Sequence, residues 1–228
     1  MSENEVIPRL DDRQRIQLSK TLSYILRHGA VKEKLNMTDD GYILVNDILN
    51  RPKLKEYTFD DVKYVVDTND KQRFKMQQSA DGLWWIRANQ GHTLATIKVE
   101  LQLIKEPLPS CVHGTFSKNW QSIAIKSDLV LQLESYDTEK QGLKRMSRNH
   151  IHFAPGMPGE DGVISGMRKS CDVFIYVDMA RAIADGITFH LSSNQVVLTD
   201  GISGILEPKY FCKVVDRKGT VLLDNSSA

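Results

Sequence analysis

The sequence predicts an α+β protein of two lobes: a helical lobe that ends in a β-hairpin, and a lobe dominated by short β-strands. Three observations predict this fold class. Amphipathic helical runs precede one hairpin pattern in the first part of the chain, a polar stretch with two prolines follows, and short β-rich runs fill the rest. At 228 residues and 41% hydrophobic content, the chain can build two small cores. The predicted parts are a flexible N-terminal tail (1–17), a helical lobe (18–98), a connector (99–110) and a β-rich lobe (111–228).

The helical lobe has the element order of a winged helix. Apolar residues at helical spacing, followed by a glycine, predict a helix over 18–30. Residues 39–49 predict a turn, a short strand and a short helix, and Thr58 with Asp61 predicts a capping box that opens a third helix. An Asp-Gly turn at 81–82 then separates two alternating runs, which is typical of a β-hairpin. Three helices followed by a hairpin form the order of a winged helix, which often binds nucleic acids.

The β-rich lobe is predicted to open with a strand over 111–116 and a helix over 117–126 that is capped by Ser117. A polar loop over 131–144 has no predicted role. The remaining predicted elements are a strand at 148–154, β-rich runs at 172–179, 187–192, 194–199 and 210–215, and a helix at 179–186.

The stretch RNHIHFA carries the first candidate site. In a strand, side chains alternate between the two faces, so Arg148, His150 and His152 would share one face opposite an apolar one. Two imidazoles at this spacing lie about 7 Å apart at the backbone, and a zinc ion could bridge them with a third ligand from His113, His190 or a carboxylate. No second spaced pair of ligands supports this alternative, and the arginine would repel a cation. We therefore predict no metal site.

Anion binding is the other interpretation of the polar residues. Arg27 and His28 close the predicted first helix, and Lys71, Arg73 and Lys75 would form a row on one face of the hairpin. Arginine offers a planar fork of donors that matches phosphate oxygens, and histidine can transfer a proton near neutral pH. Their joint occurrence points to phosphoryl chemistry. A solvated helix face and an edge strand protected by charge are the structural alternatives.

The composition of the chain limits its possible binding partners, its location and its oligomeric state. A net charge of +1 argues against nucleic-acid binding through bulk charge, so a polyanion site must be a local cluster. The sequence shows no apolar run typical of a signal peptide and no stretch of about 18 apolar residues, so we expect an intracellular protein, cytoplasmic or nuclear, without a membrane partner. Three widely separated cysteines suggest neither a disulfide framework nor a metal knuckle. The lack of long heptads favours a monomer.

Several segments together resemble the RNA 2′-phosphotransferase family, in order along nearly the whole chain. They are LSKTLSYILRHGA (18–30), DGYILVNDIL (40–49), NDKQRF (69–74), NQGH (89–92), HGT (113–115), MSRNHIHFAPG (146–156) and GVISGMR (162–168). The resemblance implies a winged-helix lobe that binds RNA, followed by an ADP-ribosyltransferase-like lobe that binds NAD+. It also implies removal of the internal 2′-phosphate that ligation leaves at a tRNA splice junction. The RNA phosphate would displace nicotinamide to give an ADP-ribosylated intermediate, and the ribose 2″-hydroxyl would then release the RNA and ADP-ribose 1″,2″-cyclic phosphate.

The same resemblance assigns roles to residues. The implied catalytic group, which would hold the 2′-phosphate, is Arg27, His28, Arg73 and Arg148, with the histidine orienting or protonating phosphate oxygens. The implied NAD+ contacts are His113, Gly114, Thr115, Ser147, His150, His152 and Arg168. For Arg168 two alternatives remain: Lys169 could make this contact, or Arg168 could be an ordinary surface residue. The implied contacts to phosphates of the 2′-phosphorylated tRNA are Lys20, Lys71 and Lys75.

Three other functions remain open at this point. The protein could be a winged-helix RNA binder whose second lobe is inactive, or an ADP-ribosyltransferase that stops after the first step. It could also be a metal-dependent hydrolase built on His150 and His152. Nicotinamide release, the final RNA product and sensitivity to chelators distinguish them.

Overall fold

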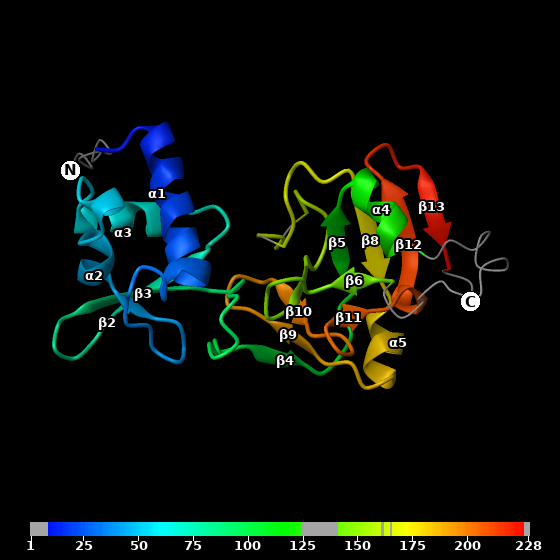
Figure 1. Ribbon diagram of the computed structural model, residues 1–228. Helices are drawn as coiled ribbons and strands as arrows, with labels where there is room; N and C mark the ends of the chain where they lie inside the picture. The colour runs from blue at the N-terminus through cyan, green and yellow to red at the C-terminus, as the bar shows by residue number, and fades with distance from the viewer. Residues whose placement is uncertain (1–8, 125–140, 161, 165, 226–228) are drawn as a thin grey trace, which may run out of the picture. The chain divides into compact units, whose positions relative to one another are not determined.

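The chain divides into two compact units, Met1–Glu100 and Leu101–Ala228. The computed structural model (Figure 1) describes residues 9–124, 141–160, 162–164 and 166–225. Each unit has its own hydrophobic core, and each is described by itself below.

The first unit combines helices with a small antiparallel sheet. Its helical elements are α1 (Asp12–Tyr24), the π-helical turn η1 (Ile25–Gly29), α2 (Val45–Leu49), the 3₁₀ turn η2 (Pro52–Leu54) and α3 (Phe59–Asp67). Its strands β1 (Ile43–Leu44), β2 (Phe74–Gln78) and β3 (Trp84–Ala88) follow the order β1-β3-β2. Apolar side chains of α1, α3 and the sheet, including Leu22, Val62 and Ile86, bury one another. The predicted helix, strand, capping box and hairpin are all present.

The predicted N-terminal tail is too long. Helix α1 begins at Asp12, because Asp11 and Gln14 form a capping box through reciprocal hydrogen bonds of 2.7 and 3.0 Å. Leu10 is buried in the core, and Arg9 forms an ion pair with Asp61 at the start of α3. Residues 9–17 are therefore part of the folded unit, while 1–8 lie outside the described residues.

The predicted row of cations on the hairpin is wrong. Strand β2 begins only at Phe74, and Gln72 takes a left-handed conformation with φ of 43°. Lys71 and Arg73 therefore lie in the turn before the strand, and only Lys75 lies on the strand itself. The alternation that we used for this segment applies only where the backbone is extended.

The second unit contains two four-stranded antiparallel sheets and two short helices. One sheet has the order β4-β9-β10-β7 and the other β13-β12-β8-β5, with a two-stranded sheet of β11 and β6 beside them (Figure 1). The strands are β4 (Gln102–Ile104), β5 (Val112–Thr115), β6 (Leu143–Lys144), β7 (Ile151–Phe153), β8 (Val173–Val177), β9 (Phe189–Leu191), β10 (Val197–Thr199), β11 (Ile205–Leu206), β12 (Phe211–Asp216) and β13 (Val221–Asp224). The helical elements are α4 (Ser117–Ile123), α5 (Met179–Ala184) and the 3₁₀ turn η4 (Pro208–Tyr210).

One core joins the two large sheets. Phe153 and Phe189 of the first sheet belong to the same buried cluster as Ile175, Phe211 and Val214 of the second. Burial of such side chains stabilises the fold by about 1.5–3 kcal/mol each. The edges of β5 and β7 meet beside this cluster through a β-bridge between Val112 and Ala154, and this contact positions the pocket described below.

Three predictions for this unit need correction. The predicted connector 99–110 contains β4, which pairs with β9 inside the sheet. The end of the predicted polar loop forms β6, which pairs with β11, while residues 131–140 lie outside the described part of the chain. Ser117 does not cap α4 through its side chain; it is the first helical residue, and its backbone N–H donates to Asp172 Oδ1 at 2.7 Å.

The mixture of helices and sheets confirms the α+β class. The winged-helix and ADP-ribosyltransferase-like descriptions of the two units stay predictions. Over the described part of the chain, no helix has the length and apolar character needed to cross a membrane.

Candidate functional site

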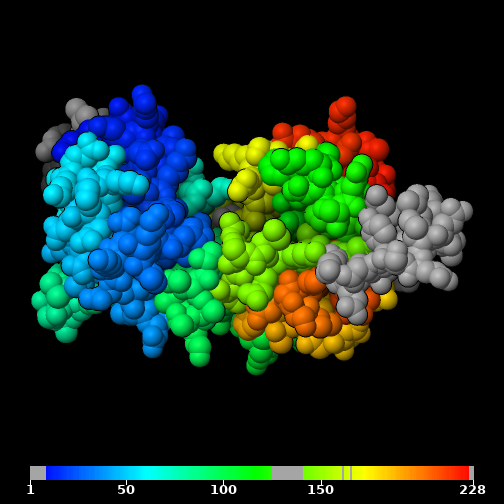
Figure 2. All heavy atoms as spheres, viewed as in Figure 1, coloured from blue at the N-terminus to red at the C-terminus, as the bar shows by residue number. Residues whose placement is uncertain are grey.

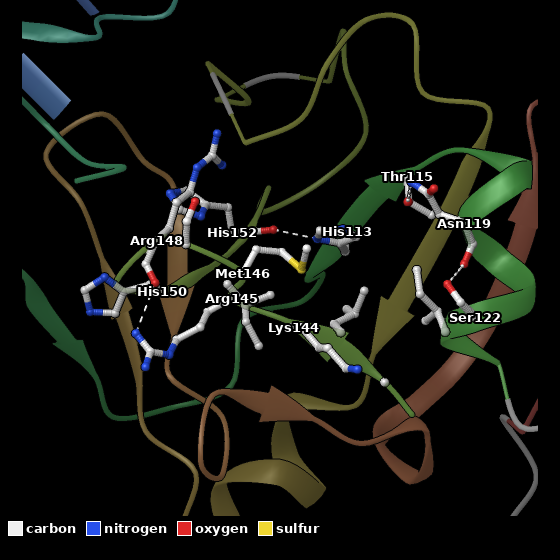
Figure 3. A pocket seen from close by; sticks show the side chains of 15 residues that line it. His113, Thr115, Asn119, Ser122, Lys144, Arg145, Met146, Arg148, His150 and His152 are labelled. Carbon is white, nitrogen blue, oxygen red and sulfur yellow. Dashed lines mark hydrogen bonds between the residues drawn. The ribbon is translucent and has the colours of Figure 1, made fainter. Parts of the chain in front are cut away.

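A pocket of about 610 Å³ opens in the second unit between β5, α4, β6 and β7. Figure 3 shows it from close by, and in Figure 2 the loop before β7 lies at the surface of this unit next to α4. Six of the residues predicted from the sequence line it: His113, Thr115, Ser147, Arg148, His150 and His152. The structure therefore brings together most of the predicted dinucleotide contacts.

The floor of the pocket is built on the paired edges of β5 and β7. His113 Nδ1 lies 2.8 Å from the carbonyl oxygen of His152, so it carries a proton and donates it (Figure 3). Burial lowers the pKa of His113; the hydrogen bond to this carbonyl opposes that shift, and the charge of Arg148 adds to it. His113 is therefore neutral at pH 7, and its Nε2 carries a lone pair that can accept a hydrogen bond.

Arg148 and His150 do not lie on a strand, contrary to our prediction. Strand β7 begins at Ile151, and the two residues lie in the loop before it. The loop is held by a hydrogen bond of 3.2 Å from Arg145 Nη1 to the carbonyl oxygen of Arg148. Both side chains still line the pocket, because the loop rather than the pleat directs them there (Figure 3).

Burial shifts the ionisation of both loop residues. The pKa of Arg148 is lowered by burial and by the charge of Arg168, although a guanidinium stays protonated at neutral pH. The pKa of His150 is also lowered, first by burial, while Asp200 at 3.4 Å from its Nε2 raises it and the charge of Arg145 lowers it. An anion entering the pocket would relieve the repulsion between the arginines.

The pocket is cationic on one side. Lys144, Arg145 and Arg148 line it, and none of the described lining residues is an aspartate or a glutamate. We did not predict Lys144 from the sequence, because we placed this residue in a polar loop without a role, and we gave Arg145 no role either. We also did not predict Asn119 and Ser122 of α4, which line the pocket. The two are joined by a hydrogen bond of 2.8 Å from Ser122 Oγ to the backbone carbonyl oxygen of Asn119.

Two of the predicted contacts lie outside the pocket lining. Gly114 faces Met167 and Cys171, and a Cβ there would come within 2.8 Å of Met167 Cβ, so this glycine allows close packing of β5. Arg168 is exposed, and its charge acts on Arg148. In the described residues, no three His, Cys, Asp or Glu side chains gather in a way that could hold a metal ion.

The second candidate cluster lies in the first unit, where Arg27 and His28 occupy the π-helical turn η1. Such turns inside helices are frequent at functional sites. Thr93 holds the turn: its N–H donates to Arg27 O at 3.0 Å, and its hydroxyl donates to the same oxygen at 3.2 Å. The hydroxyl oxygen lies 3.2 Å from His28 Nδ1. Because the single hydroxyl proton is used on the carbonyl, the oxygen accepts from Nδ1–H, and Nε2 carries the lone pair of the neutral ring.

The segment before Thr93 also forms hydrogen bonds with the backbone around Arg73. The backbone N–H of Asn89 donates to Arg73 O at 2.9 Å, and its side-chain amide donates to Gln72 O at 2.6 Å. Asn69 Oδ1 accepts from Arg73 N at 3.1 Å and from Arg73 Nη1 at 3.2 Å. Burial lowers the pKa of Arg73, and Asp70 opposes this shift. Residues 89–93 thus fix the backbone on which three of the four predicted catalytic residues lie.

Glycine at position 91 makes this arrangement possible. Gly91 has φ of 88°, and a Cβ on it would lie 3.3 Å from Nε of Arg27. The sequence carried a signal here, since NQGH and NDKQRF belong to the segments that resemble the family, but it gave Asn69, Asn89 and Thr93 no role. Of the lysines predicted to contact RNA, Lys20 and Lys75 are exposed and Lys71 is half-buried.

Comparisons with known proteins agree on one family. A sequence profile described as "RNA 2'-phosphotransferase, Tpt1 / KptA family" matches residues 13–201. The chain is 44% identical to "tRNA 2'-phosphotransferase 1" of Danio rerio over 211 residues, which cover 90% of this chain and 87% of the relative. For the protein of that name from Homo sapiens, the identity is 45% over 219 residues, with 93% and 80% covered. For "tRNA 2'-phosphotransferase" of Saccharomyces cerevisiae it is 40% over 175 residues, with 73% and 70% covered. The resemblance found in the sequence is confirmed.

Proposed function

Because the chain belongs to the RNA 2′-phosphotransferase, Tpt1 / KptA family, we propose that it removes the internal 2′-phosphate of ligated tRNA by transferring it to NAD+. The relatives are named for transfer of a tRNA 2′-phosphate, which supports the substrate and the reaction class. The observation that carries the NAD+ part is the pocket of the second unit, whose described lining offers cations and neutral donors and no carboxylate.

The first step is an exchange at the ribose carbon that bears nicotinamide. An oxygen of the RNA 2′-phosphate forms a bond to this carbon, the carbon–nitrogen bond breaks, and nicotinamide leaves with the electron pair. The attacking phosphate is already an anion, so the step needs cations that hold it more than it needs a base. Arg148 lines the pocket and is one such cation. The family resemblance implies that Arg27 and Arg73 are two more.

The second step is a transesterification at phosphorus. The 2″-hydroxyl of the ADP-ribose forms a bond to phosphorus and loses its proton, and the bond from phosphorus to the RNA 2′-oxygen breaks. The RNA leaves with a 2′-hydroxyl, and the other product is ADP-ribose 1″,2″-cyclic phosphate. His28 orients the phosphate and exchanges protons with its oxygens through Nε2, because its Nδ1 is held by Thr93.

The pocket supports NAD+ binding by its size and its donor set. A volume of about 610 Å³ lies in the range of sites that enclose a small ligand or cofactor. Lys144 and Arg145 face the pyrophosphate in this proposal, and His113 accepts a hydrogen bond through Nε2. His152 and Thr115 complete the wall beside the ribose and nicotinamide.

The remaining predictions fit this function. The first unit acts as the winged-helix RNA-binding lobe, with Lys20, Lys71 and Lys75 on RNA phosphates, and the second as the ADP-ribosyltransferase-like lobe. The affinity of the first unit for RNA therefore falls as the salt concentration rises. The protein acts as an intracellular monomer without a metal.

The test uses a short RNA with one internal 2′-phosphate and the purified full chain, with and without NAD+, in the presence of a chelator. The expected result is loss of the 2′-phosphate only with NAD+, together with release of nicotinamide and ADP-ribose cyclic phosphate. Alanine at Arg27, Arg73 or Arg148 is expected to lower the rate at least about 100-fold, as loss of a group that stabilises transition-state charge does. Lys118→Ala, an exposed change on α4, serves as the matched control.

Each other outcome identifies a different function. Accumulation of ADP-ribosylated RNA without cyclic phosphate means that the enzyme stops after the first step. RNA that is bound but unchanged means that the second unit is inactive. Phosphate release without NAD+ that the chelator abolishes means a metal-dependent hydrolase.

A further inference from the structure

A second cavity of the protein lies in the first unit and has no role in the proposed chemistry. It has a volume of about 330 Å³ and lies between one face of α1 and the segment that leads into η2. The lining residues that matter here are Lys20, Thr21, Tyr24, Glu33, Arg51 and Lys53, and we name this cavity the α1 groove. Lys20 and Tyr24 are four residues apart and so lie on the same face of the helix.

The α1 groove is positively charged. Lys20, Arg51 and Lys53 line it against one carboxylate, that of Glu33. Lys20 and Lys53 are exposed, and no ion pair involves either of them among residues 9–124. Arg51 is held in place, because its Nη1 donates to Glu33 O at 2.9 Å. Its Nε is buried and has no hydrogen-bond partner within the described residues. The groove therefore offers one fixed guanidinium and two mobile ammonium groups to an anion.

One lining residue of the groove, Tyr24, lies next to the predicted catalytic histidine. Tyr24 is 43% exposed, and its ring packs on Gly29, where a Cβ would lie 2.7 Å from Tyr24 Cε1. The ring centroids of Tyr24 and His28 are 6.4 Å apart. Along the helix, Lys20 and Tyr24 are separated by about 6 Å. Lys20, the ring of Tyr24 and His28 thus follow one another at four-residue spacing along α1 and η1, and Arg51 and Lys53 face this stripe from η2 and the residue before it.

We propose that the α1 groove binds the nucleotide next to the one that carries the 2′-phosphate. This rests on the proposed function, which places the 2′-phosphate at His28. The base of the neighbouring nucleotide stacks on Tyr24, and its backbone phosphate contacts Lys20, Arg51 and Lys53. Aromatic faces beside a cationic groove are how proteins bind single-stranded nucleic acid without reading its sequence. The groove is therefore a subsite for single-stranded RNA that flanks the splice junction.

The test compares two substrates. One is a single nucleotide that carries a 2′-phosphate and has no neighbouring nucleotide, and the other is an RNA that carries the same 2′-phosphate with several nucleotides on both sides. Lys53→Glu is expected to raise the KM of the extended RNA at least about fivefold and to leave the KM of the single nucleotide unchanged. Tyr24→Leu, which keeps an apolar side chain and removes the ring, is expected to show the same split. Lys55→Glu is the matched control, since this exposed lysine lies outside the groove.

The salt dependence gives a second readout. If Lys53 contacts a phosphate, its loss lowers the slope of log affinity against log salt for the extended RNA by about one. Equal effects of Lys53→Glu on both substrates, or no effect on either, would overturn the proposal. Thermal denaturation of each variant shows that the chain is folded.

Failure of the proposed function can be recognised separately. If the wild-type protein acts on neither substrate, the binding of unphosphorylated single-stranded RNA is measured by fluorescence anisotropy. Weaker binding by Lys53→Glu than by Lys55→Glu then still supports the subsite. Equal binding overturns it and leaves a protein partner as the occupant to seek.

Discussion

Replacing Thr93 by valine tests whether the arrangement of Arg27 and His28 matters for catalysis. Valine has nearly the shape of threonine, so the change removes the hydroxyl and little else. The hydroxyl makes two hydrogen bonds, to Arg27 O and to His28 Nδ1, both at 3.2 Å. Each contributes about 0.5–1.5 kcal/mol. Because His28 is exposed and water can replace its partner, we expect the free energy of unfolding to fall by only about 1 kcal/mol.

The effect on the reaction should be larger than the effect on stability. Without the hydroxyl, the imidazole of His28 can rotate and either nitrogen can carry the proton, so Nε2 is no longer selected. A general acid or base contributes about 10²–10⁴ to the rate, and an imidazole that is misaligned forfeits part of this. We expect kcat to fall about tenfold, which corresponds to about 1.4 kcal/mol, while the KM for NAD+ stays unchanged.

The assay is single-turnover removal of the 2′-phosphate at several pH values, with Thr93→Ser as the conservative variant. Serine keeps the hydroxyl, so it should restore most of the rate. Thr93→Val is also measured in a His28→Ala background, where it should cost nothing further if it acts through the histidine. A wild-type kcat in Thr93→Val at every pH, or full additivity in the double variant, would refute the reasoning.

Three further predictions follow from other contacts. Asp61→Ala should lower the free energy of unfolding by about 2 kcal/mol in urea, because it removes a capping box and an ion pair. Burial raises the pKa of Asp61, but hydrogen bonds from Arg9 and Thr58 outweigh this effect, so the pKa of Asp61 is lowered overall. The loss of stability in Asp61→Ala should therefore shrink as the pH falls below about 4, and a loss that is the same at every pH would contradict this prediction. Gly91→Ala should cost about 1–2 kcal/mol and also lower kcat, whereas Gly82→Ala, at φ of 82° in the hairpin, should lower stability alone. Asp200→Asn should lower the pKa of His150 further, since this carboxylate raises it; an NMR titration that shows no decrease would contradict the assignment.

Local patterns in the sequence predicted most of the elements. The spacing of Leu18, Leu22 and Leu26, the capping box of Thr58 and the Asp-Gly turn all depend on residues within a few positions of one another. Errors arose where a contact distant in sequence decides the structure. Arg9 belongs to the first unit because it pairs with Asp61, 52 residues away, and no local pattern reveals that.

The same distinction applies to the site. Arginine and histidine residues suited to phosphate chemistry could be identified from residue type and from the family resemblance, and four of them, His113, Arg148, His150 and His152, line one pocket. We predicted that Arg148 and His150 share a face because side chains alternate along a strand. Both residues instead line the pocket from a loop that is held by Arg145. Lys144 was not predicted as a lining residue, since the sequence of a polar loop does not show which distant segment it packs against.

The sequence by itself determined the α+β class, the helices and hairpin of the first unit, and the family. These depend on periodicity, capping and residue identity, which are properties of short segments. Only the tertiary structure decided which nitrogen of His28 is held, since Thr93 lies 65 residues further along the chain. It also decided that Lys144 and Arg145 line the pocket and that Tyr24 lines the α1 groove. The physical reason is that hydrogen bonds and cavities form between segments whose separation in sequence carries no information about their distance in space.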